Sequence, residues 1–342
     1  MIRNAFQAIG LTLILGLFLA CGNKPKNSKE EQDYQRAARY FVADESFKPI
    51  LDEELQVFLY HSLLDTLEAQ YTNEQEAVQK LMHLDTWLAF TTRRLTAKEE
   101  QNLKDRRYIP RTYALAYDGL AIITNNSNPD TCITVRDFRR ILQGELVKWS
   151  DIYPKSKLGD IDVVFDNPLS STVRWCVDSI LGGKEFKAPN IGAVKTSKAV
   201  IDYVEQHPNA MGIIGSNWLN DSRDTTNVTF KKNIQVMKVS RMDSATAANS
   251  WRPYQYYLYN GNYPLIRTIY AILNEPRTGL PSNFAHFCRL PKGQTIILQS
   301  GLLPIQAAMN EREVIVNKKL KDKHFRLSNV SKMDDGWKMD DG

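Results

Sequence analysis

The segment from Asp160 to Gly183 constrains the fold more than any other part of the chain. Its first residues, Ile161 to Phe165, are rich in β-forming side chains, and a short loop follows them. The hydroxyl-bearing residues Ser170-Ser171-Thr172 come next, and a helix-like run from there ends at Gly182-Gly183. This order predicts a strand, a hydroxyl-rich loop and a helix.

The hydroxyl-rich loop has two interpretations. Serine and threonine are the ordinary residues that cap a helix N-terminus, and capping alone explains the pattern. The same hydroxyls, together with unpaired backbone N–H groups, can also hold an oxyanion. Arg174 in the first helical turn bears on the choice, because the helix dipole opposes a cation there at a cost of roughly 0.3–1 kcal/mol. We therefore expect an anion or a carboxylate beside Arg174.

A second strand–loop–helix unit stands near the start of the chain. Tyr40 to Ala43 is strand-like, Asp44-Glu45-Ser46 is polar, and apolar residues recur at three- and four-residue spacing between Phe47 and Gln70. Strands alternate with helices in the rest of the body, which predicts an α/β fold with parallel or mixed sheets. In such sheets ligands bind at the carboxyl ends of the strands, where both junctions point.

The N-terminus has the layout of a secretory signal peptide. Arg3 precedes an apolar run from Ile9 to Ala20, which is shorter than the about 20 residues that a membrane-spanning helix needs. Phe18-Leu19-Ala20-Cys21 resembles the lipobox of bacterial lipoproteins, with Phe18 where leucine is usual. We expect a leader over residues 1–20 and lipidation at Cys21; the alternative is an ordinary signal peptide followed by a chance cysteine.

Polar segments flank the folded body. Residues 21–37 are polar and charged, which predicts a flexible tether. Residues 316–342 are rich in Lys, Asp and Ser and end in a repeated Lys-Met-Asp-Asp-Gly pentad, which predicts a flexible charged tail. Its aspartates lack the spacing and the final glutamate of a calcium loop. The body of about 280 residues exceeds the size of one usual core, which favours two lobes.

Charge and cysteine content exclude several classes of function. The formal net charge is +5, with basic residues scattered and no basic stripe interleaved with aromatic residues, so no nucleic-acid partner is expected. Cys132, Cys176 and Cys288 allow at most one disulfide in an exported protein, and the sequence does not select a pair. The cysteines and the five histidines lack metal-site spacing, so we expect no metal and no cofactor.

Several short blocks together resemble the phosphate-binding protein family of bacterial ABC importers, which has a type II periplasmic binding protein fold. No single block is specific, but they stand in the family's order across roughly residues 38 to 310. The blocks are Tyr117-Asp118-Gly119-Leu120-Ala121, Leu142-Gln143-Gly144 with Trp149-Ser150-Asp151, Ser170-Ser171-Thr172-Val173-Arg174, Ala210-Met211-Gly212-Ile213-Ile214-Gly215, Tyr263-Pro264-Leu265, Pro291-Lys292-Gly293-Gln294 and Gly301-Leu302-Leu303-Pro304.

The resemblance implies two lobes that close over an oxyanion. Each lobe would be a mixed sheet flanked by helices, and two crossing strands, near Ala114 to Ile122 and Ser240 to Ile266, would join them. Lobe 1 would then be discontinuous, formed by residues 38–116 and 245–315, and lobe 2 would be formed by residues 117–244.

The resemblance also implies a set of ligand-binding residues. The Ser170 to Thr172 loop matches the family's anion loop in lobe 2. Ser46 falls at the first lobe 1 loop, and Thr91 and Thr92 stand at the second. With Arg174, the candidate ligand-binding residues are Ser46, Thr91, Thr92, Ser170, Ser171, Thr172 and Arg174.

Three positions depart from the family pattern. Asp166 stands where many members carry an arginine, four residues before the anion loop. Thr92 stands where they carry an aspartate that accepts a proton from hydrogen phosphate, and Ser171 replaces a glycine. Arg93, Arg94 or Arg174 are the candidates to supply the missing positive charge.

Together these features predict a monomeric, lipid-anchored solute-binding protein on the extracytoplasmic side of a bacterial membrane, in the periplasm or at the cell surface. It would capture phosphate or a related oxyanion for the permease of an ABC importer. The alternative is a cell-envelope interaction or sensory lipoprotein without a transport role. We expect no enzyme activity, because no histidine that could act as a base lies near Ser170 or Ser171 in the sequence.

Overall fold

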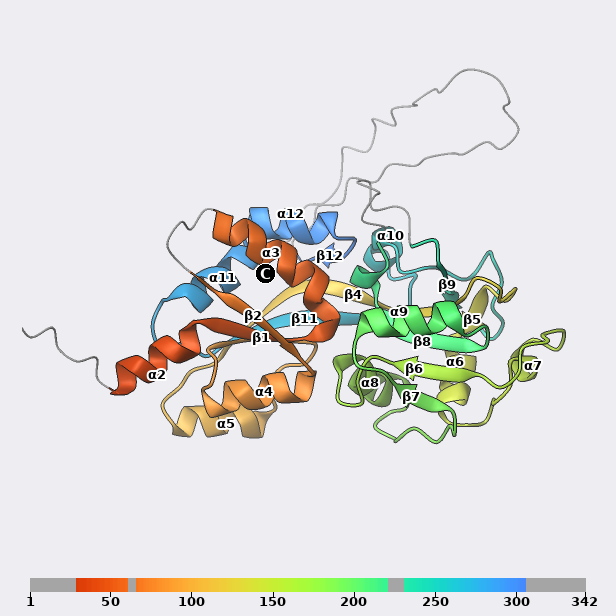
Figure 1. The fold of residues 1–342 in the computed structure, drawn as a ribbon, viewed down its shortest axis with the longest axis horizontal. Coiled ribbons are helices and arrows are strands. Elements are labelled where there is room, and N and C mark those ends of the chain that lie inside the picture. The colour runs from red at the N-terminus through yellow and green to blue at the C-terminus, as the bar shows by residue number, and fades with distance from the viewer. Residues whose placement is uncertain (1–28, 61–65, 221–230, 306–342) are drawn as a thin grey trace, which may run out of the picture. The chain divides into compact units, whose positions relative to one another are not determined.

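The computed structural model describes residues 29–60, 66–220 and 231–305 (Figure 1). The predicted signal peptide, Cys21 and the charged tail over residues 316–342 lie outside the described residues. Within them, no helix combines the length and the hydropathy that crossing a membrane requires.

Lobe 1 is built on a mixed sheet with the strand order β2-β1-β3-β11-β4. Strand β1 is parallel to β2 and β3, and β11 runs antiparallel to β3 and to the first part of β4. These strands are β1 (Tyr40–Asp44), β2 (Glu68–Thr72), β3 (Leu88–Thr91), β4 (Arg111–Asn125) and β11 (Ile266–Leu273).

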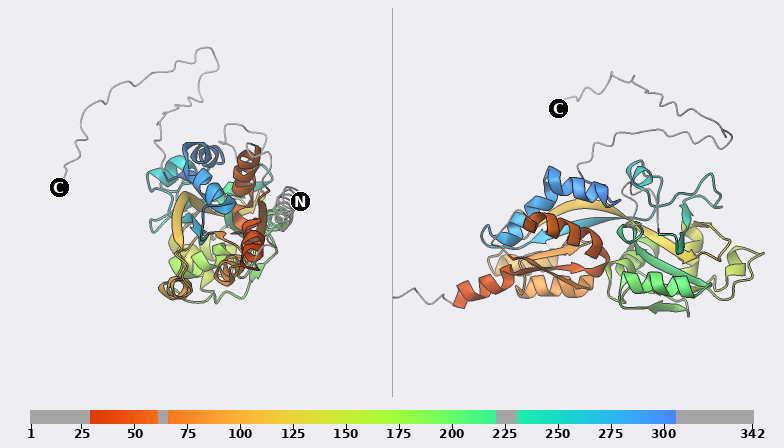
Figure 2. Two further views of the ribbon diagram at one scale, coloured as in Figure 1. Left: turned by 90° about the vertical axis from the view of Figure 1, so that its left-hand side faces the viewer. Right: turned by 45° about the horizontal axis from the view of Figure 1, so that its top comes forward.

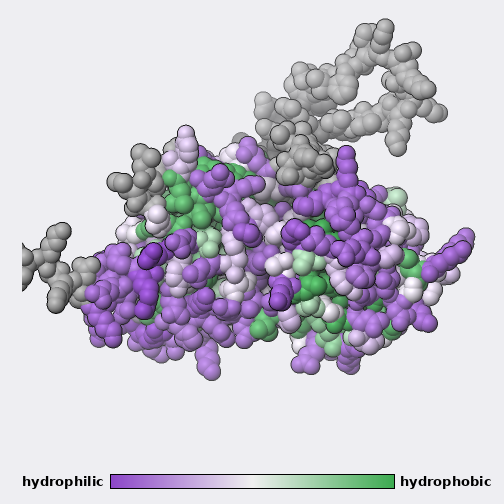
Figure 3. Space-filling view, viewed as in Figure 1, coloured by the Kyte–Doolittle hydropathy of each residue, from purple (hydrophilic) through white to green (hydrophobic). Residues whose placement is uncertain are grey.

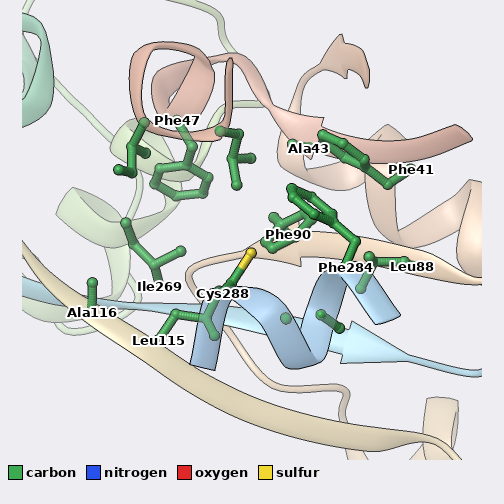
Figure 4. Close-up of a cluster of buried hydrophobic side chains, with 14 of the residues drawn as sticks. Phe41, Ala43, Phe47, Leu88, Phe90, Leu115, Ala116, Ile269, Phe284 and Cys288 are labelled. Atoms are coloured by element: carbon green, nitrogen blue, oxygen red, sulfur yellow. The ribbon is translucent and has the colours of Figure 1, made fainter. Parts of the chain in front are cut away.

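Helices cover both faces of this sheet (Figures 1 and 2). On one face, aromatic side chains fill the core, and the Phe41 ring lies 5.1 Å from those of Phe90 and Phe284 (Figure 4). The helices α3 (Lys48–Tyr60), α11 (Leu280–Arg289) and α12 (Pro291–Gln299) lie on this aromatic face of the sheet, and α4 (Glu74–His83) and α5 (Ala97–Asp105) lie on the other face. The outer surface in view in Figure 3 carries mostly hydrophilic residues.

Lobe 2 continues the same sheet through the second part of β4. There β4 pairs antiparallel with β8 and β9, while β6 lies parallel between β8 and β7. Every residue of β8 is buried, as the apolar run of its sequence predicts for a strand covered on both faces. The strands are β6 (Asp162–Phe165), β7 (Ile191–Ala193), β8 (Ala210–Gly215) and β9 (Ile234–Val236).

Shorter elements complete lobe 2 and the return to lobe 1. A two-stranded parallel sheet joins β5 (Cys132–Thr134) to β10 (Lys238–Ser240), and β12 (Leu303–Pro304) pairs with β4. The helices are α6 (Val135–Leu142), α7 (Trp149–Ile152), α8 (Ser171–Trp175), α9 (Ser197–Gln206) and α10 (Gln255–Tyr259), with a π-helical turn η2 (Cys176–Ile180) and 3-10 turns η1 (Glu45–Phe47) and η3 (Ser216–Trp218).

Strand β4 forms the first crossing between the lobes, and Gly119 lies where it passes from β11 to β8. A Cβ on Gly119 would lie 2.6 Å from the Cβ of Pro253, so a larger residue does not fit without movement. The chain returns between Ser240 and Ile266 to start β11, in agreement with the predicted second crossing. We propose that the boundaries between the lobes lie between residues 116 and 117 and between residues 244 and 245.

The structure differs from the prediction in one flanking segment. Residues 29–37, which we expected to belong to a flexible tether, form most of helix α2 (Lys29–Ala38). The polar composition that suggested a tether is also that of a surface helix with acidic residues in its first turn. The helix packs on lobe 1: Trp87 Nε1 donates to the carbonyl of Tyr34 at 3.1 Å, and Ala37 and Ala38 are buried beside Trp87.

Candidate functional site

The two predicted strand–loop–helix junctions meet between the lobes. Ser46 follows β1 in lobe 1, and Ser171 begins α8 after β6 in lobe 2. Their hydroxyl oxygens lie 3.2 Å apart, and both residues are buried. Because both loops stand at the carboxyl ends of strands, the topology brings together residues 125 positions apart in the sequence.

The lobe 2 loop serves first as a helix cap. The Oγ of Ser170 accepts a hydrogen bond from the backbone N–H of Val173 at 3.3 Å, so the capping interpretation is confirmed for Ser170. The hydroxyl of Ser170 also donates to Asp166 Oδ1 at 2.7 Å, and that of Thr172 donates to the same oxygen. Two of the three predicted anion-loop hydroxyls are therefore bonded to a carboxylate of their own lobe.

Arg267 lies at the centre of the cluster, and our sequence analysis missed it. It projects from β11, and its Nη1 donates to Ser171 Oγ at 2.9 Å while Nη2 donates to Ser46 Oγ at 3.2 Å. Its Nε donates to Asp118 Oδ2 at 2.8 Å, and its guanidinium lies 5.2 Å from the centre of the Phe47 ring. A lone charge in the apolar run of β11 was the available signal, since buried arginines are rare unless paired.

Asp44 is the second residue that we missed. Its Oδ1 accepts the backbone N–H of Ser46 at 3.0 Å, and its Oδ2 accepts the backbone N–H of Ser171 at 2.9 Å. One carboxylate thus joins the backbones of the two lobes. Burial, followed by repulsion from Glu74, raises the pKa of Asp44.

Asp166 gives the same region a surplus of carboxyl groups. It is buried, and burial followed by the charge on Asp44 raises the pKa of Asp166 to about 7. Where the resemblance predicts an arginine, the structure therefore has an acid that keeps its proton to a higher pH than an ordinary aspartate. The positive charge of the cluster comes instead from Arg267, on a different element.

Arg174 has the negative neighbour that its position called for, and this neighbour is a carboxylate. Its Nε donates to Glu74 of lobe 1, and its Nη2 donates to Thr92 Oγ1 at 2.5 Å. Glu74 Oε1 also accepts the N–H and the hydroxyl of Thr92, at 2.6 and 2.8 Å. Burial alone would raise the pKa of Glu74, but the hydrogen bond and charge of Arg174 lower it.

Three other predicted candidates point elsewhere. The hydroxyl of Thr91 donates to the carbonyl of Arg93 at 2.7 Å, within its own loop. Arg93 forms a bidentate ion pair with Glu99, with N–O distances of 2.7 and 2.8 Å. Arg94 lies over the ring of Tyr270, 5.3 Å from its centre. The described contacts of Arg93 and Arg94 therefore do not supply the positive charge that we sought.

Further polar contacts hold the two lobes together around Ser46. Glu45 Oε2 accepts the N–H and the hydroxyl of Ser197, at 2.9 and 2.8 Å. The carbonyl of Ser46 accepts the side chains of Asn217 and Trp218, at 2.9 and 3.0 Å. The lobes are therefore in contact in this structure. A cavity of about 250 Å³ remains beside the cluster, lined among others by Asp44, Tyr71, Asp166, Ser170 and Lys195.

No metal or disulfide site appears in the part of the chain that the structure describes. Within it, no three His, Cys, Asp or Glu side chains are grouped to hold a metal ion. Cys132, Cys176 and Cys288 are free thiols, so the disulfide that the sequence left open does not form among them.

The family follows from comparison with known proteins. A family model described as a PBP superfamily domain matches residues 38–289. The chain belongs to the PBP superfamily. This membership confirms the predicted two-lobed α/β fold and the predicted class, a binding protein rather than an enzyme.

Curated proteins that are similar to this chain include phosphate-binding proteins called PstS. The one from Pseudomonas aeruginosa is 22% identical over 224 residues, which are 60% of this chain and 64% of the relative. The one from Borreliella burgdorferi is 24% identical over 270 residues, which are 75% of this chain and 86% of the relative. The chain thus spans a little under two thirds of the length of the first of these relatives.

Two solved structures share the fold. A protein from Clostridium perfringens, solved with bound phosphate, matches with a TM-score of 0.65 and 19% identity, over 78% of this chain and 99% of its own. A phosphate transport receptor from Vibrio cholerae matches with a TM-score of 0.58 and 19% identity, over 77% of this chain and 98% of its own. At this identity the two matches bear on the fold alone.

Proposed function

We propose that this PBP superfamily member is an extracytoplasmic solute-binding protein that captures phosphate or a related oxyanion between its lobes for the permease of an ABC importer. One observation carries the proposal: hydrogen-bond donors from both lobes converge at the buried contact of Ser46 with Ser171, beside the guanidinium of Arg267. Hydroxyls, backbone amides and arginine are the groups that bind oxyanions in proteins. The phosphate-binding relatives support the choice of ligand.

Lobe closure is the mechanism that fits this arrangement. A ligand that contacts both lobes binds the closed state more tightly than the open one and shifts the population towards closure. The permease would then distinguish the closed, loaded protein from the open one. Ser46 on one lobe and Ser171 on the other are the residues through which this coupling would act.

Isothermal titration calorimetry with phosphate, sulfate and molybdate tests the proposal on protein prepared from residue 22 onward, without the lipid. We expect saturable heat with at least one of the three anions. Ser46→Ala should weaken that binding, while Ser127→Ala, which removes an exposed hydroxyl of lobe 2, should leave it unchanged. Absence of heat and of any thermal shift with all three anions would exclude oxyanion capture.

The lipid anchor is part of the same proposal. The lipobox-like Phe18-Leu19-Ala20-Cys21 supports cleavage before Cys21 and attachment of the mature chain to a membrane by lipid. In cells fed a radiolabelled fatty acid, the full chain should carry label and fractionate with membranes. The Cys21→Ser variant should carry none; equal labelling of the two chains would remove the anchor from the proposal.

One observation favours a second candidate function. The lobes are already joined by side chains of the protein itself, through the contacts of Asp44, Glu45 and Glu74 with lobe 2. Such a protein would suit a cell-envelope interaction or sensory lipoprotein without a transport role. Co-purification with an envelope partner supports this candidate, whereas permease and ATPase genes beside its own support transport.

A further inference from the structure

Carboxylates of lobe 1 occupy hydrogen-bond donors of lobe 2 at three places. Asp44 accepts the backbone N–H of Ser171, and Glu45 accepts the backbone N–H and the hydroxyl of Ser197. Glu74 accepts the guanidinium of Arg174. Each donor is of a kind that an oxyanion would use. In this structure the protein's own acids use them.

Asp44 differs from the other two because it reproduces the bridging role of a ligand. One of its oxygens takes an amide of lobe 1, at Ser46, and the other takes an amide of lobe 2, at Ser171. It is fully buried, so water does not weaken these bonds. A carboxylate in this position favours the closed arrangement in the same way as a bound anion would.

We propose that Asp44 is an internal substitute for the ligand, which holds the lobes closed without an anion and must release the amide of Ser171 before an oxyanion can bind there. The second half of this statement rests on the proposed function, and the first half does not. Asp44 thereby sets the concentration of anion at which the cleft responds. The strength of this competition also decides between the two candidate functions. If Asp44 always outcompetes the anion, the protein stays closed without a ligand and does not transport.

The charges around Asp44 support this competition. Three other acids lie near Asp44. Glu45 is on the same loop and contacts Ser197, Glu74 on α4 raises the pKa of Asp44, and Asp166 follows β6. Arg267 from β11 is the cation of the cluster, and it already forms an ion pair with Asp118. An anion that enters beside a charged Asp44 therefore meets a surplus of negative charge, and unpaired like charges are costly inside a protein.

Two pairs of variants test the internal substitute. Asp44→Asn removes the charge but keeps the shape and one acceptor oxygen. Asp105→Asn is its matched control, because Asp105 is exposed on α5 of lobe 1 and accepts a hydrogen bond from Gln101 of the same helix. Ser171→Pro removes the N–H that Asp44 accepts. Proline is tolerated at the first helical position, and Ser170 already has φ −75° and ψ 164°, as a residue before proline requires. Ser171→Ala is its control: it also loses the hydroxyl but keeps the N–H, so the difference between the two variants isolates the N–H.

The first readout is lobe closure without any anion, followed by small-angle X-ray scattering and by hydrogen exchange at residues 170–175. We expect Asp44→Asn and Ser171→Pro to shift the protein towards the open form, with a larger radius of gyration and faster exchange. Asp105→Asn should stay close to the wild type, and Ser171→Ala should remain more closed than Ser171→Pro because it keeps the N–H that Asp44 accepts. If Asp44→Asn and Ser171→Pro remain as closed as their controls, Asp44 does not hold the lobes and the proposal is overturned.

The second readout is the affinity for inorganic phosphate by titration calorimetry. We expect Asp44→Asn to bind phosphate about tenfold more tightly than both the wild type and Asp105→Asn, which corresponds to about 1.4 kcal/mol. Equal affinities of Asp44→Asn and the wild type would overturn the competition. If no variant binds phosphate, sulfate or molybdate, the proposed function fails, and the closure data alone decide whether Asp44 joins the lobes.

Discussion

Arg267 and Asp118 form an ion pair in which neither side chain is exposed to solvent, with Nε and Oδ2 separated by 2.8 Å. The pair connects β11 to β4, the strand that crosses between the lobes. Asp118 Oδ1 also accepts the N–H and the hydroxyl of Ser216, at 2.9 and 2.8 Å. Arg267 therefore connects the crossing strands to the hydroxyl cluster.

Removing Arg267 should be strongly destabilising. Arg267→Met leaves Asp118 buried without its countercharge, and such a change costs about 3–5 kcal/mol in the free energy of unfolding. The double variant Arg267→Met with Asp118→Leu should recover much of this loss, because no lone charge remains. Urea unfolding measures all three proteins. Arg277→Met is the matched control: it breaks a surface pair with Glu31 and should cost much less than Arg267→Met.

The Arg174–Glu74 pair should make the free energy of unfolding depend on pH in the acidic range. Arg174 lowers the pKa of Glu74, so the pair stabilises the fold above the unfolded pKa of glutamate and loses this effect as the pH falls through the folded pKa. The stability difference between the wild type and Arg174→Ala should therefore be large near pH 7 and shrink towards about pH 3, below the ordinary glutamate pKa of 4.5. Lys198→Ala, which breaks an exposed pair with Asp202, should show little difference at either pH.

Urea unfolding at the two pH values measures this difference. A constant gap between the wild type and Arg174→Ala would show that Arg174 stabilises by packing alone. If Arg174 instead contacts the ligand, Arg174→Ala should weaken oxyanion binding by about 1.5–3 kcal/mol, as for a lost charged hydrogen bond. Calorimetry on the same variant, with Ser127→Ala for comparison, distinguishes the two roles.

Oxyanion binding should strengthen as the pH falls through about 7, the pKa of Asp166. A protonated Asp166 no longer repels the anion, and the raised pKa of Asp44 acts in the same direction. Sulfate is the best probe, because its own charge stays constant over this range. We expect a higher affinity for sulfate at about pH 6 than at about pH 8, by at most tenfold per pH unit for each proton taken up. Asp166→Asn should reduce this dependence, and an unchanged slope would assign the titration to another group.

The strand–loop–helix junctions could be predicted from the sequence because their signals are local. The β-forming run before Ser170, the capping hydroxyl and the terminal glycines all lie within a short window, and the structure has the expected strand and helix there. The negative partner of Arg174 could also be predicted, since the helix dipole requires one. The partner in lobe 1 could not, because Glu74 lies 100 residues away. Asp178, which also accepts a hydrogen bond from Arg174, lies four residues away.

The centre of the site could not be predicted from local patterns. Arg267 and Asp118 are 149 residues apart, and only the pairing of β11 with β4 brings them together. Asp44 was visible as a polar residue at the end of a strand, but nothing local indicates that its carboxylate reaches Ser171 in the other lobe. The direction of the Thr91 side chain depends on the backbone of its loop, which the residue type does not determine.

A buried acid in the core of lobe 1 supplies the last prediction. Glu54 lies on the inner face of α3 with an exposed fraction of 1%, beside the thiol of Cys288. Burial, followed by the charge on Glu53, raises the pKa of Glu54 from 4.5 to about 8. The folded protein therefore holds this proton over a pH range in which the unfolded chain releases it.

The raised pKa of Glu54 determines the direction in which the free energy of unfolding changes with pH. Stability from Glu54 is fully present below pH 4.5 and is lost as the pH rises towards about 8, at up to about 1.4 kcal/mol per pH unit. Glu54→Gln stays neutral throughout, so its free energy of unfolding relative to the wild type should rise between about pH 5 and pH 8. Urea unfolding across this range measures the difference, with exposed Glu68→Gln as the control. Parallel pH profiles for the wild type and Glu54→Gln would mean that Glu54 is ionised in the folded protein.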